Sequence, residues 1–470
     1  MAASRRPVQA KRVRAPRSRQ RPGLRARART ALRGVSGNRF GTASVLLVMV
    51  LTVAGLKLVY LQAFQADALS ARAERQRATV IDIPAHRGSI TDRNGTELAF
   101  SVKTRMLQVN LKAMRETWDK VAEQPGAKQN YGTRVAAIAE YMAAMLPGKT
   151  TEQDLLRRFH KPAPFTFLVD NVDPSVAEQI TTRFPEIYAE ERALREYPGG
   201  TLASNVVGYA NWRMEDPNVA KHNLHGLIGL ESARDNDLAG KPGRRLVDTG
   251  EGDNVVIPGT ERDIQPAVAG SNLELTLDSD LQYDLQRRLS QYVEQTRAEG
   301  GSAVIMDART GEVYALANDK TFDPNDLDAA SEAQLNNRAV TTPYEPGSVN
   351  KVVTAAAAIE HGVTTPKAVH RVPGQIQIAD RTVRDAWAHG MQGFTTTGIF
   401  AKSSNVGTLM LAQQVGEDRW LEIAEKLGLG KRTGIGLPGE SPGRVPPRNQ
   451  WSGSTFGNLP IGQGLSMTVV

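Results

Sequence analysis

The sequence contains no cysteine among its 470 residues. Disulfides, thiolate catalysis and cysteine-ligated zinc or iron–sulfur sites are therefore excluded. Histidine is scarce as well, with seven scattered residues and no His-Glu-x-x-His pattern. The residues themselves therefore predict no bound metal and no cofactor.

Acidic residues are missing from residues 1–40, which hold 13 of the 58 basic residues. The remainder carries 45 basic against 50 acidic residues, so the net charge of +8 belongs to a basic tail on a mildly acidic body. This tail has no apolar periodic face, and we predict that it is disordered. Nucleic-acid binding would suit its charge, but the next segment gives a simpler reason for it, and we expect no nucleic-acid partner.

A run of apolar or small residues follows the tail from Gly41 to Leu56 and resumes after Lys57. The span 41–63 is long enough for a transmembrane helix, since a bilayer core takes about 20 helical residues. A cleaved signal peptide is the alternative, but the basic region is too long and no small-x-small cleavage site stands out. The positive-inside rule then places residues 1–40 in the cytoplasm and everything after residue 64 outside. Anionic lipid headgroups would also attract the tail.

At about 150 residues per domain, a chain of 470 residues is expected to form roughly three units. Thr79–Ile83 alternates like a strand, Asn94-Gly95 is a hairpin-turn signal, and residues 113–185 have the pattern of short helices. Further on, residues 273–278 alternate as an entry strand, and the spacing of apolar residues predicts a helix over 280–296. Two buried strands of a hairpin are predicted within residues 302–317.

Ser348 and Lys351 form a Ser-x-x-Lys motif between a Pro-Gly loop and an Ala-rich segment that is typical of a buried helix. Three residues is just under one helical turn, so both side chains lie on one face. A lysine amine whose pKa is lowered can take the proton of a serine hydroxyl, and the first helical turn offers free N–H groups to an oxyanion. A bare motif is weak evidence, because a serine N-cap followed by a solvated lysine gives the same letters.

A second constellation is Ser403-Ser404-Asn405, between an apolar stretch and a predicted helix over 406–414. Ser403 can relay a proton between Lys351 and a leaving amine. Asn405 can hold the lysine and bind a substrate amide. The alternative is a helix N-cap made by Ser404 or Asn405.

Together these two motifs resemble those of serine penicillin-recognising enzymes. Blocks upstream resemble the pedestal signatures of class B penicillin-binding proteins, and they are Arg87-Gly88-x-Ile90-x-Asp92-Arg93-Asn94-Gly95, Arg195-x-Tyr197-Pro198-x-Gly200 and Gly226-x-x-Gly229-x-Glu231. Late blocks also fit, and they are Gly428-Leu429-Gly430, Leu437-Pro438-Gly439-Glu440 and Ile461-Gly462-Gln463-Gly464. With the anchor, the basic tail and Trp451-Ser452-Gly453-Ser454, the chain looks most like the septal transpeptidase of actinobacteria.

The resemblance implies a multi-domain α+β fold. We expect a disordered basic tail over residues 1–40, a transmembrane helix over 41–63, an elongated pedestal (dimerisation) domain over 64–265, and part of a transpeptidase domain over 266–470. The last is an α/β sandwich like that of serine β-lactamases. Tight-turn roles are the simpler interpretation of the pedestal glycines.

The implied activity is serine-type D,D-transpeptidation at the septal plasma membrane. Ser348, Lys351, Ser403 and Asn405 are the expected catalytic residues. The D-Ala-D-Ala stem peptides of peptidoglycan are the expected substrates, and β-lactams are expected to acylate Ser348 as donor mimics. A membrane glycan polymerase and bitopic division proteins are the expected partners, docking on residues 65–260.

One motif of the family, Lys-Thr/Ser-Gly on an inner strand, does not occur in this sequence. In relatives it lies downstream of the Gly-Gln-Gly block and supplies a second oxyanion N–H. We therefore expect the 470 residues to be part of a longer protein, with an unpaired strand edge and no cross-linking activity alone. Losing one oxyanion donor typically costs about 10²–10³ in rate.

Two other functions remain open on the sequence. A β-lactamase or antibiotic-sensing domain is disfavoured by the pedestal blocks and by the lack of a recognisable deacylating glutamate. A non-catalytic division scaffold, which recruits partners through its pedestal, is disfavoured by the retained motif residues, but it stays a live alternative for this chain.

Overall fold

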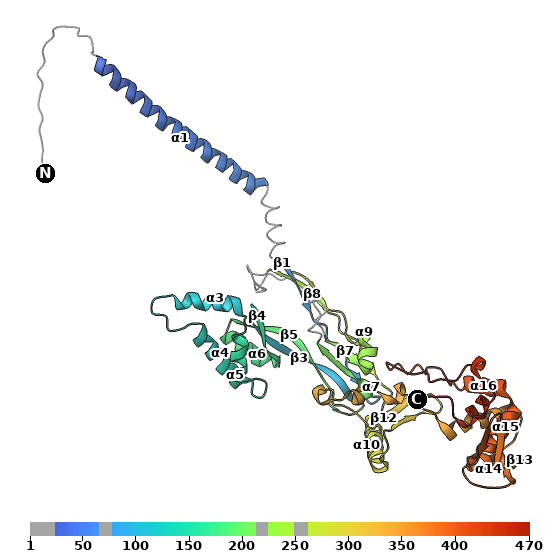
Figure 1. The fold of residues 1–470 in the computed structure, drawn as a ribbon. Coiled ribbons are helices and arrows are strands. Elements are labelled where there is room, and N and C mark those ends of the chain that lie inside the picture. The colour runs from blue at the N-terminus through green and yellow to red at the C-terminus, as the bar shows by residue number, and fades with distance from the viewer. Residues whose placement is uncertain (1–23, 65–77, 213–223, 249–261) are drawn as a thin grey trace, which may run out of the picture. The chain divides into compact units, whose positions relative to one another are not determined.

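The computed structural model describes residues 24–64, 78–212, 224–248 and 262–470 (Figure 1). The chain forms two compact units, which are residues 1–80 with 246–262 and residues 81–245 with 263–470. We call the second unit the body.

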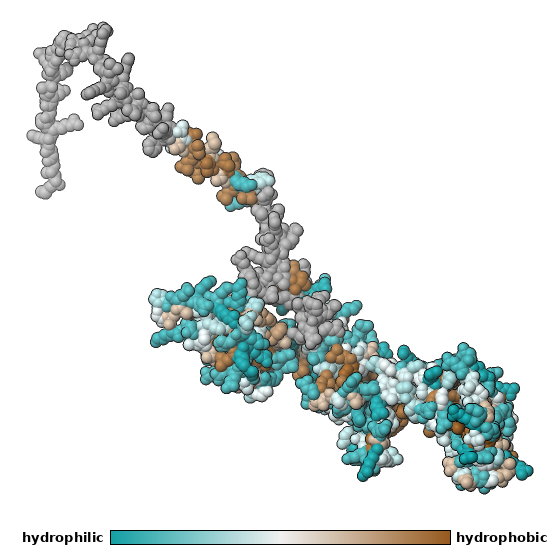
Figure 2. All heavy atoms as spheres, viewed as in Figure 1, coloured by the Kyte–Doolittle hydropathy of each residue, from teal (hydrophilic) through white to brown (hydrophobic). Residues whose placement is uncertain are grey.

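Helix α1 (Leu24–Phe64) contains the predicted membrane span. Residues Gly41–Gln62 are long and apolar enough to cross a membrane, and their apolar side chains form the brown band along this helix in Figure 2. The helix begins at Leu24, so residues 24–40 are helical where the sequence predicted disorder. Their alanine, leucine and arginine content favours a helix, and proline is missing from them. The tail before residue 24 lies outside the described residues.

Strand β1 (Ala78–Ile83) confirms the strand predicted over Thr79–Ile83. Residues 65–77, between α1 and β1, lie outside the described residues. Two further strands lie where the chain passes between the units, and they are β8 (Gly243–Asp248) and β9 (Arg262–Gln265).

The first half of the body, residues 81–245, is built on a sheet with the order β10-β2-β3-β4, in which β5 also pairs with β3. The strands are β2 (Ile90–Thr91), β3 (Glu97–Asn110), β4 (Phe165–Val172), β5 (Ile187–Glu196) and β10 (Leu273–Glu274). β2 and β3 run antiparallel on either side of Asn94-Gly95, which confirms the predicted turn. β10 runs parallel to β2 and is shorter than the predicted entry strand.

Four helices accompany this sheet, as the pattern of residues 113–185 predicted. They are α3 (Leu111–Ala122), α4 (Tyr131–Met145), α5 (Glu152–Phe159) and α6 (Pro174–Arg183). Each begins with a side-chain cap, from Asn110, Asn130, Thr151 and Asp173 respectively. Leu107 and Leu168 of the strands and Ile138, Leu155 and Ile180 of the helices form a fully buried core. Strand β4 was missed because its buried positions do not alternate regularly.

Short elements follow in this half: α7 (Ser204–Val207), β6 (Tyr209–Trp212), β7 (Leu224–Ile228), α8 (Gly229–Ala233) and α9 (Asp235–Leu238). Gly229 has a φ of +62°, and a Cβ on Gly226 would lie 1.8 Å from the carbonyl oxygen of Glu231. A left-handed backbone at Gly229 and this close approach at Gly226 both require glycine, but Gly226 lies within strand β7 and not in the predicted tight turn.

Buried charges join three distant blocks of this half. Glu231 has a fully buried side chain and accepts hydrogen bonds from Arg87 Nε at 2.6 Å and Arg195 Nε at 2.7 Å. Arg87 also donates to Asp235 at 2.6 Å. We call Arg87, Arg195 and Glu231 the arginine–glutamate cluster. The cluster links strand β5 to helix α8 and to the segment before β2.

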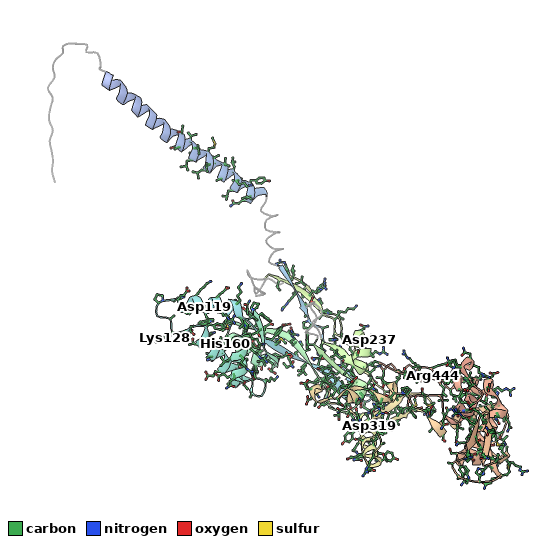
Figure 3. All side chains as sticks on the ribbon, viewed as in Figure 1. Asp119, Lys128, His160, Asp237, Asp319 and Arg444 are labelled. Atoms are coloured by element: carbon green, nitrogen blue, oxygen red, sulfur yellow. The ribbon has the colours of Figure 1, made fainter. Side chains whose placement is uncertain are left out.

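The second half of the body begins with helix α10 (Ser279–Thr296) and the antiparallel strands β11 (Ser302–Met306) and β12 (Val313–Asn318), as predicted, although β11 is partly exposed where the sequence predicted a buried strand. Within the described residues β11 and β12 form a two-stranded sheet. Asp319, labelled in Figure 3, follows β12 and accepts a hydrogen bond from Gly301 N at 3.0 Å, which closes the end of the hairpin. Helices α11 (Glu332–Leu335) and α12 (Arg338–Thr341) come next.

A helical core forms the remainder, from α13 (Lys351–Glu360), α14 (Thr396–Ala401), α15 (Asn405–Val415) and α16 (Glu417–Lys426). Its strands form two antiparallel pairs, which are β13 (Val369–Val372) with β16 (Gln392–Thr395) and β14 (Gln375–Ile378) with β15 (Arg381–Arg384). Trp420 is fully buried in this core beside Phe456. Ser466 exchanges backbone hydrogen bonds with Arg444, labelled in Figure 3, at 2.8 and 2.9 Å.

Candidate active site

Ser348 is exposed in a short 3₁₀ segment, η3 (Gly347–Asn350), directly before α13. The sequence predicted an α-helix from Ser348, so this turn is tighter than expected. Gly347 has a φ of +58°, and its N–H donates to Gly462 O at 3.0 Å. In a 3₁₀ turn the side chains of residues i and i+3 eclipse, so Ser348 and Lys351 still share one face.

The Gly462-Gln463-Gly464 block contacts the loop that carries Ser348. A Cβ on Gly462 would lie 1.8 Å from Gly347 O, so glycine is required at position 462. Gly464 N donates to Glu345 Oε1 at 2.9 Å. The loop that carries Ser348 is therefore fixed by a segment more than a hundred residues later.

Helix α13 is fixed in a similar way by the segment η6 (Leu459–Ile461). Asn350 Nδ2 donates to Leu459 O at 3.0 Å, and Thr354 Oγ1 donates to Pro460 O at 2.9 Å. Trp420 Nε1 donates to the same Thr354 hydroxyl at 3.0 Å. These bonds hold the first turns of the helix in one position.

Lys351 is only 3 % exposed. Its Nζ donates to Ser403 O at 2.7 Å, to Ser403 Oγ at 3.1 Å and to Asn405 Oδ1 at 2.7 Å. All three partners are neutral oxygens, and burial lowers the pKa of Lys351 to about 8, although the charge of Asp385 opposes this shift. Lys351 is therefore an amine that titrates near neutral pH.

The loop at residues 403–405 joins α14 to α15. Ser403 is exposed and has a φ of +54°. Ser404 is fully buried, and its Oγ accepts from Gly407 N at 2.9 Å, which makes it the N-cap of α15. The cap and the lysine contacts therefore coexist: Ser404 caps the helix while Ser403 and Asn405 bind Lys351.

The sequence did not single out Asp385 and His389, which the structure places beneath this loop. Asp385 Oδ1 accepts from Val406 N at 2.9 Å, and Oδ2 accepts from Ser404 Oγ at 2.7 Å and from His389 Nε2 at 2.9 Å. Burial alone would raise the pKa of Asp385, but hydrogen bonds from Val406, His389 and Ser404 outweigh it and hold that pKa below its ordinary value. No linear motif marks these residues, because the loop residues that Asp385 binds, Ser404 and Val406, lie 19 and 21 residues away.

All four residues predicted from the two motifs therefore lie in one neighbourhood. Lys351, Ser403 and Asn405 are in direct contact, and Ser348 stands one turn before Lys351. The arrangement pairs an exposed hydroxyl with a buried amine that can accept a proton near pH 8. Within the described ranges, no group of three or more His, Asp or Glu side chains is arranged to hold a metal ion.

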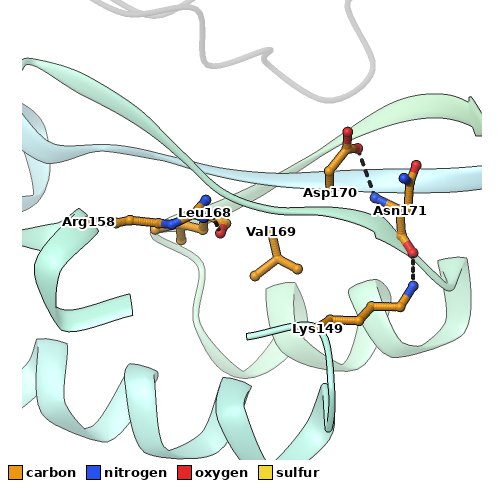
Figure 4. Close-up of a pocket in the computed structure, with 6 residues that line it drawn as sticks. All are labelled: Lys149, Arg158, Leu168, Val169, Asp170 and Asn171. Carbon is orange, nitrogen blue, oxygen red and sulfur yellow. Dashed lines mark hydrogen bonds between the residues drawn. The ribbon is translucent and has the colours of Figure 1, made fainter. Parts of the chain in front are cut away.

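A separate hollow lies beside β4 (Figure 4). It is lined by Lys149, Arg158, Leu168, Val169, Asp170 and Asn171. Lys149 donates to the carbonyl of Asn171, and Arg158 Nη1 donates to Leu168 O at 2.8 Å. Both cations thus bind the backbone of the hollow's own wall, and the geometry gives them a structural role.

Comparison with known proteins matches residues 82–275 to the penicillin-binding protein dimerisation domain and residues 301–470 to the penicillin-binding protein transpeptidase domain. Penicillin-binding protein PbpB of Mycobacterium tuberculosis is 47 % identical over 434 residues, which are 92 % of this chain and 62 % of that protein. A probable peptidoglycan D,D-transpeptidase, PenA of Neisseria meningitidis, is 30 % identical over 91 % of this chain and 69 % of its own length.

Among solved structures, penicillin-binding protein 3 of M. tuberculosis in complex with aztreonam is similar, with a TM-score of 0.56 and 41 % identity. The match covers 83 % of this chain and 62 % of that one. The chain thus spans less than two thirds of its mycobacterial relatives. With a dimerisation domain preceding a transpeptidase domain, and with identity sustained over nine tenths of its length, the chain belongs to the class B penicillin-binding proteins.

Proposed function

We propose that this chain carries the serine acyl-transfer site of a peptidoglycan D,D-transpeptidase that cross-links the septal cell wall. The environment of Lys351 is the observation that carries the proposal. Its amine is buried, its three partners are neutral oxygens, and its pKa is lowered to about 8. A general base is most effective when its pKa lies near the working pH.

In the first half-reaction, Ser348 Oγ attacks the carbonyl carbon between the two D-Ala residues of a stem peptide while Lys351 takes the hydroxyl proton. The tetrahedral oxyanion lies at the first turn of η3–α13, where helical N–H groups have no partner within the helix. Collapse of the intermediate breaks the peptide bond. The proton passes from Lys351 through Ser403 Oγ to the leaving amine, and free D-Ala departs.

In the second half-reaction, the amine of a neighbouring stem peptide attacks the ester carbonyl. Lys351 removes the amine's proton and returns one to Ser348 Oγ as the ester bond breaks. The products are a new amide cross-link and the free serine. Asn405 keeps Lys351 in place through both steps and offers its amide to the substrate backbone.

A β-lactam would enter the same route by presenting its strained amide to Ser348 in place of the D-Ala-D-Ala bond. The mycobacterial protein solved with aztreonam supports this part of the proposal. The chemistry uses side chains and backbone N–H groups of the chain and calls for no metal or cofactor.

The location follows from the charge pattern. The basic residues of segment 1–40, ahead of the apolar span, favour a cytoplasmic location for this segment and a location outside the membrane for the body. The septal role rests on the likeness to the mycobacterial PbpB protein. A membrane glycan polymerase and bitopic division proteins are the proposed partners of residues 65–260, within a pedestal of residues 64–265 that precedes the transpeptidase part.

Covalent labelling by a fluorescent penicillin tests the acyl-transfer site. The membrane-embedded protein is incubated for minutes to hours, and the labelled residue is identified by mass spectrometry. We expect label on Ser348 that disappears in Ser348→Ala and persists in Ser290→Ala, whose serine is exposed on α10. Folded protein that stays unlabelled, or a label that survives Ser348→Ala, would refute the proposal and favour the scaffold role.

The pH dependence of labelling tests the base. Below its pKa the Lys351 amine is protonated and cannot accept the serine proton, so the acylation rate should rise with pH and level off above about 8. At pH 6 only about one hundredth of the amine is free, so the rate should be about a hundredfold below its plateau. A profile that is flat between pH 6 and 9 would exclude Lys351 as the base.

A further inference from the structure

A buried acid–histidine pair lies under the loop that holds Lys351. The side chains of Asp385 and His389 are 0 % and 2 % exposed, and they meet at 2.9 Å. Neither residue contacts Lys351 directly in the hydrogen-bond network described above. Burying two ionisable groups is unfavourable unless they are paired, and here each is hydrogen-bonded to the other.

The contacts of His389 show that its ring carries both protons. Nε2 faces the carboxylate of Asp385, and Nδ1 lies 2.7 Å from Gly390 O. A carboxylate and a carbonyl are both acceptors, so both ring nitrogens must donate. Trp387 stacks on the ring at 5.3 Å and Phe394 meets it edge-on at 5.9 Å. The hydrogen bond to Asp385 outweighs burial and raises the pKa of His389 above its ordinary value.

The pair is joined to Lys351 through three consecutive residues of the loop. Asp385 binds the Ser404 hydroxyl and the Val406 N–H, while the carbonyl of Arg384 accepts from Asn405 Nδ2 at 3.1 Å. Asn405 is one of these three residues, and Ser403 directly precedes them. Both bind Lys351 Nζ. A shift of Asp385 would therefore move every partner of Lys351.

We propose that Asp385 and His389 form a positioning pair for Lys351. Asp385 fixes the loop that holds the amine, and the positive charge of His389 offsets the negative charge that Asp385 would otherwise exert on it. This inference rests on the proposed function only in taking Lys351 as the base.

The other charged groups around the pair do not replace His389. Strand β14, strand β16 and helix α15 contain no ionisable residue. Arg384 of β15 directs its Nε to Gln375 Oε1 at 3.0 Å, and Lys402 beside the loop is exposed. On β13, His370 binds the hydroxyls of Thr364 and Thr396, and Arg371 is exposed. His389 is therefore the cation that is hydrogen-bonded to Asp385.

Two substitutions should move the Lys351 pKa in opposite directions. In His389→Gln the amide can still donate to Asp385, but the compensating charge is lost, so the pKa of Lys351 should rise by about one unit. In Asp385→Asn the amide oxygen can still accept from Val406 N, but the negative charge is lost, so the pKa should fall. A purely structural pair would slow acylation equally at every pH and leave the pKa unchanged.

Competitive acetylation with trace acetic anhydride measures this pKa without any catalysis. The membrane-embedded protein and its variants are labelled between pH 6 and 10, and the Lys351 peptide is quantified by mass spectrometry against exposed Lys426. His370→Gln is the matched control, because His370 binds neutral threonines, and it should leave the Lys351 midpoint at the wild-type value. The acylation profile with fluorescent penicillin should shift by the same amount, which is about tenfold slower labelling at pH 7 in His389→Gln.

Opposite shifts in His389→Gln and Asp385→Asn support the positioning pair. Equal midpoints in all variants, or shifts of the same sign, overturn it. If His389→Gln does not fold, a ¹³C–¹H titration of His389 in the wild-type protein still decides: a pKa at or below 6.5 overturns the proposal. Should the midpoints shift while Ser348 remains unlabelled, the pair stands and the proposed transpeptidase function fails.

Discussion

The body buries cations in two different ways. In the arginine–glutamate cluster, Arg87 and Arg195 meet the carboxylate of Glu231 at 2.6 and 2.7 Å, with every side chain at most 1 % exposed. Lys351 is nearly as buried, but its partners are a carbonyl, a hydroxyl and a carboxamide. A cation next to a carboxylate stays charged, whereas one held by neutral oxygens can release its proton.

This difference separates a structural charge from a reactive one. An arginine remains charged in any protein environment, so Arg87 and Arg195 serve as permanent hydrogen-bond donors between distant segments. A lysine shifts its pKa readily on burial. Asp385, the carboxylate beneath the Lys351 loop, is itself paired with His389, and its charge opposes but does not reverse the lowering of the Lys351 pKa by burial. The hydrogen-bond partners of the Lys351 amine are thus neutral oxygens and not a carboxylate.

Removing the reactive cation should have the largest effect. Lys351→Met keeps the length of the side chain and removes the base, so acylation by fluorescent penicillin should slow about 10²–10⁴-fold. Lys426→Met is the matched control, because Lys426 lies exposed on α16 in an ion pair with Glu422. Labelling of Lys351→Met at the wild-type rate would contradict the distinction between a reactive Lys351 and structural arginines.

Removing the carboxylate of the structural cluster should act on stability and not on reactivity. Glu231→Gln leaves the buried Arg195 without a counter-charge and Arg87 with Asp235 alone, which should lower the free energy of unfolding by about 3–5 kcal/mol. Denaturant unfolding of the membrane-embedded protein measures this, while labelling per folded molecule should stay at the wild-type level.

Asp284→Asn is the control for that experiment. Asp284 pairs with Arg287 and Arg288 on the exposed face of α10, and such a solvent-screened surface pair should contribute far less to stability than the buried cluster. Equal losses in the two variants would show that burial is not what makes the arginine–glutamate cluster important.

Giving Lys351 a carboxylate partner should make its environment resemble that of Arg87 and Arg195. Of the three substitutions at Lys351, Glu231 and Asn405, this one should have the smallest effect. Asn405→Asp places a negative charge where Oδ1 now lies, 2.7 Å from Nζ. The pKa of Lys351 should rise by about 1–3 units, and the acylation profile should move to higher pH by the same amount. A uniform loss of rate with no change of midpoint would instead indicate damage to the loop, in which Asn405 also binds Arg384 O.

Much of the local structure could be predicted because it depends on neighbouring residues. The spacing of Leu281, Leu285 and Leu289 predicted α10, and the two apolar runs within 302–317 predicted β11 and β12. The apolar run predicted a span that lies within α1. Strands β4 and β5 were not predicted, because both pair with the long strand β3 and their buried positions reflect that pairing.

The candidate site divides in the same way. The two motifs named Ser348, Lys351, Ser403 and Asn405, but they left open whether Ser404 or Asn405 was a helix cap. The structure assigns the cap to Ser404, whose hydroxyl donates to Asp385 and accepts from Gly407 N. The contacts of Asp385 with Ser404 and Val406 and the contact of Gly462 with Gly347 were missed, since each joins segments far apart in the chain, and His389 was missed with its partner Asp385.

By itself, the sequence determined the membrane span, the order of helices and strands around the motifs, and which residue types could do chemistry, because these follow from short-range spacing and composition. Only the tertiary structure decided which charges are paired. Whether a buried cation faces Glu231 or the neutral oxygens of Ser403 and Asn405 depends on contacts between segments tens to hundreds of residues apart, and those contacts set whether the cation can give up its proton.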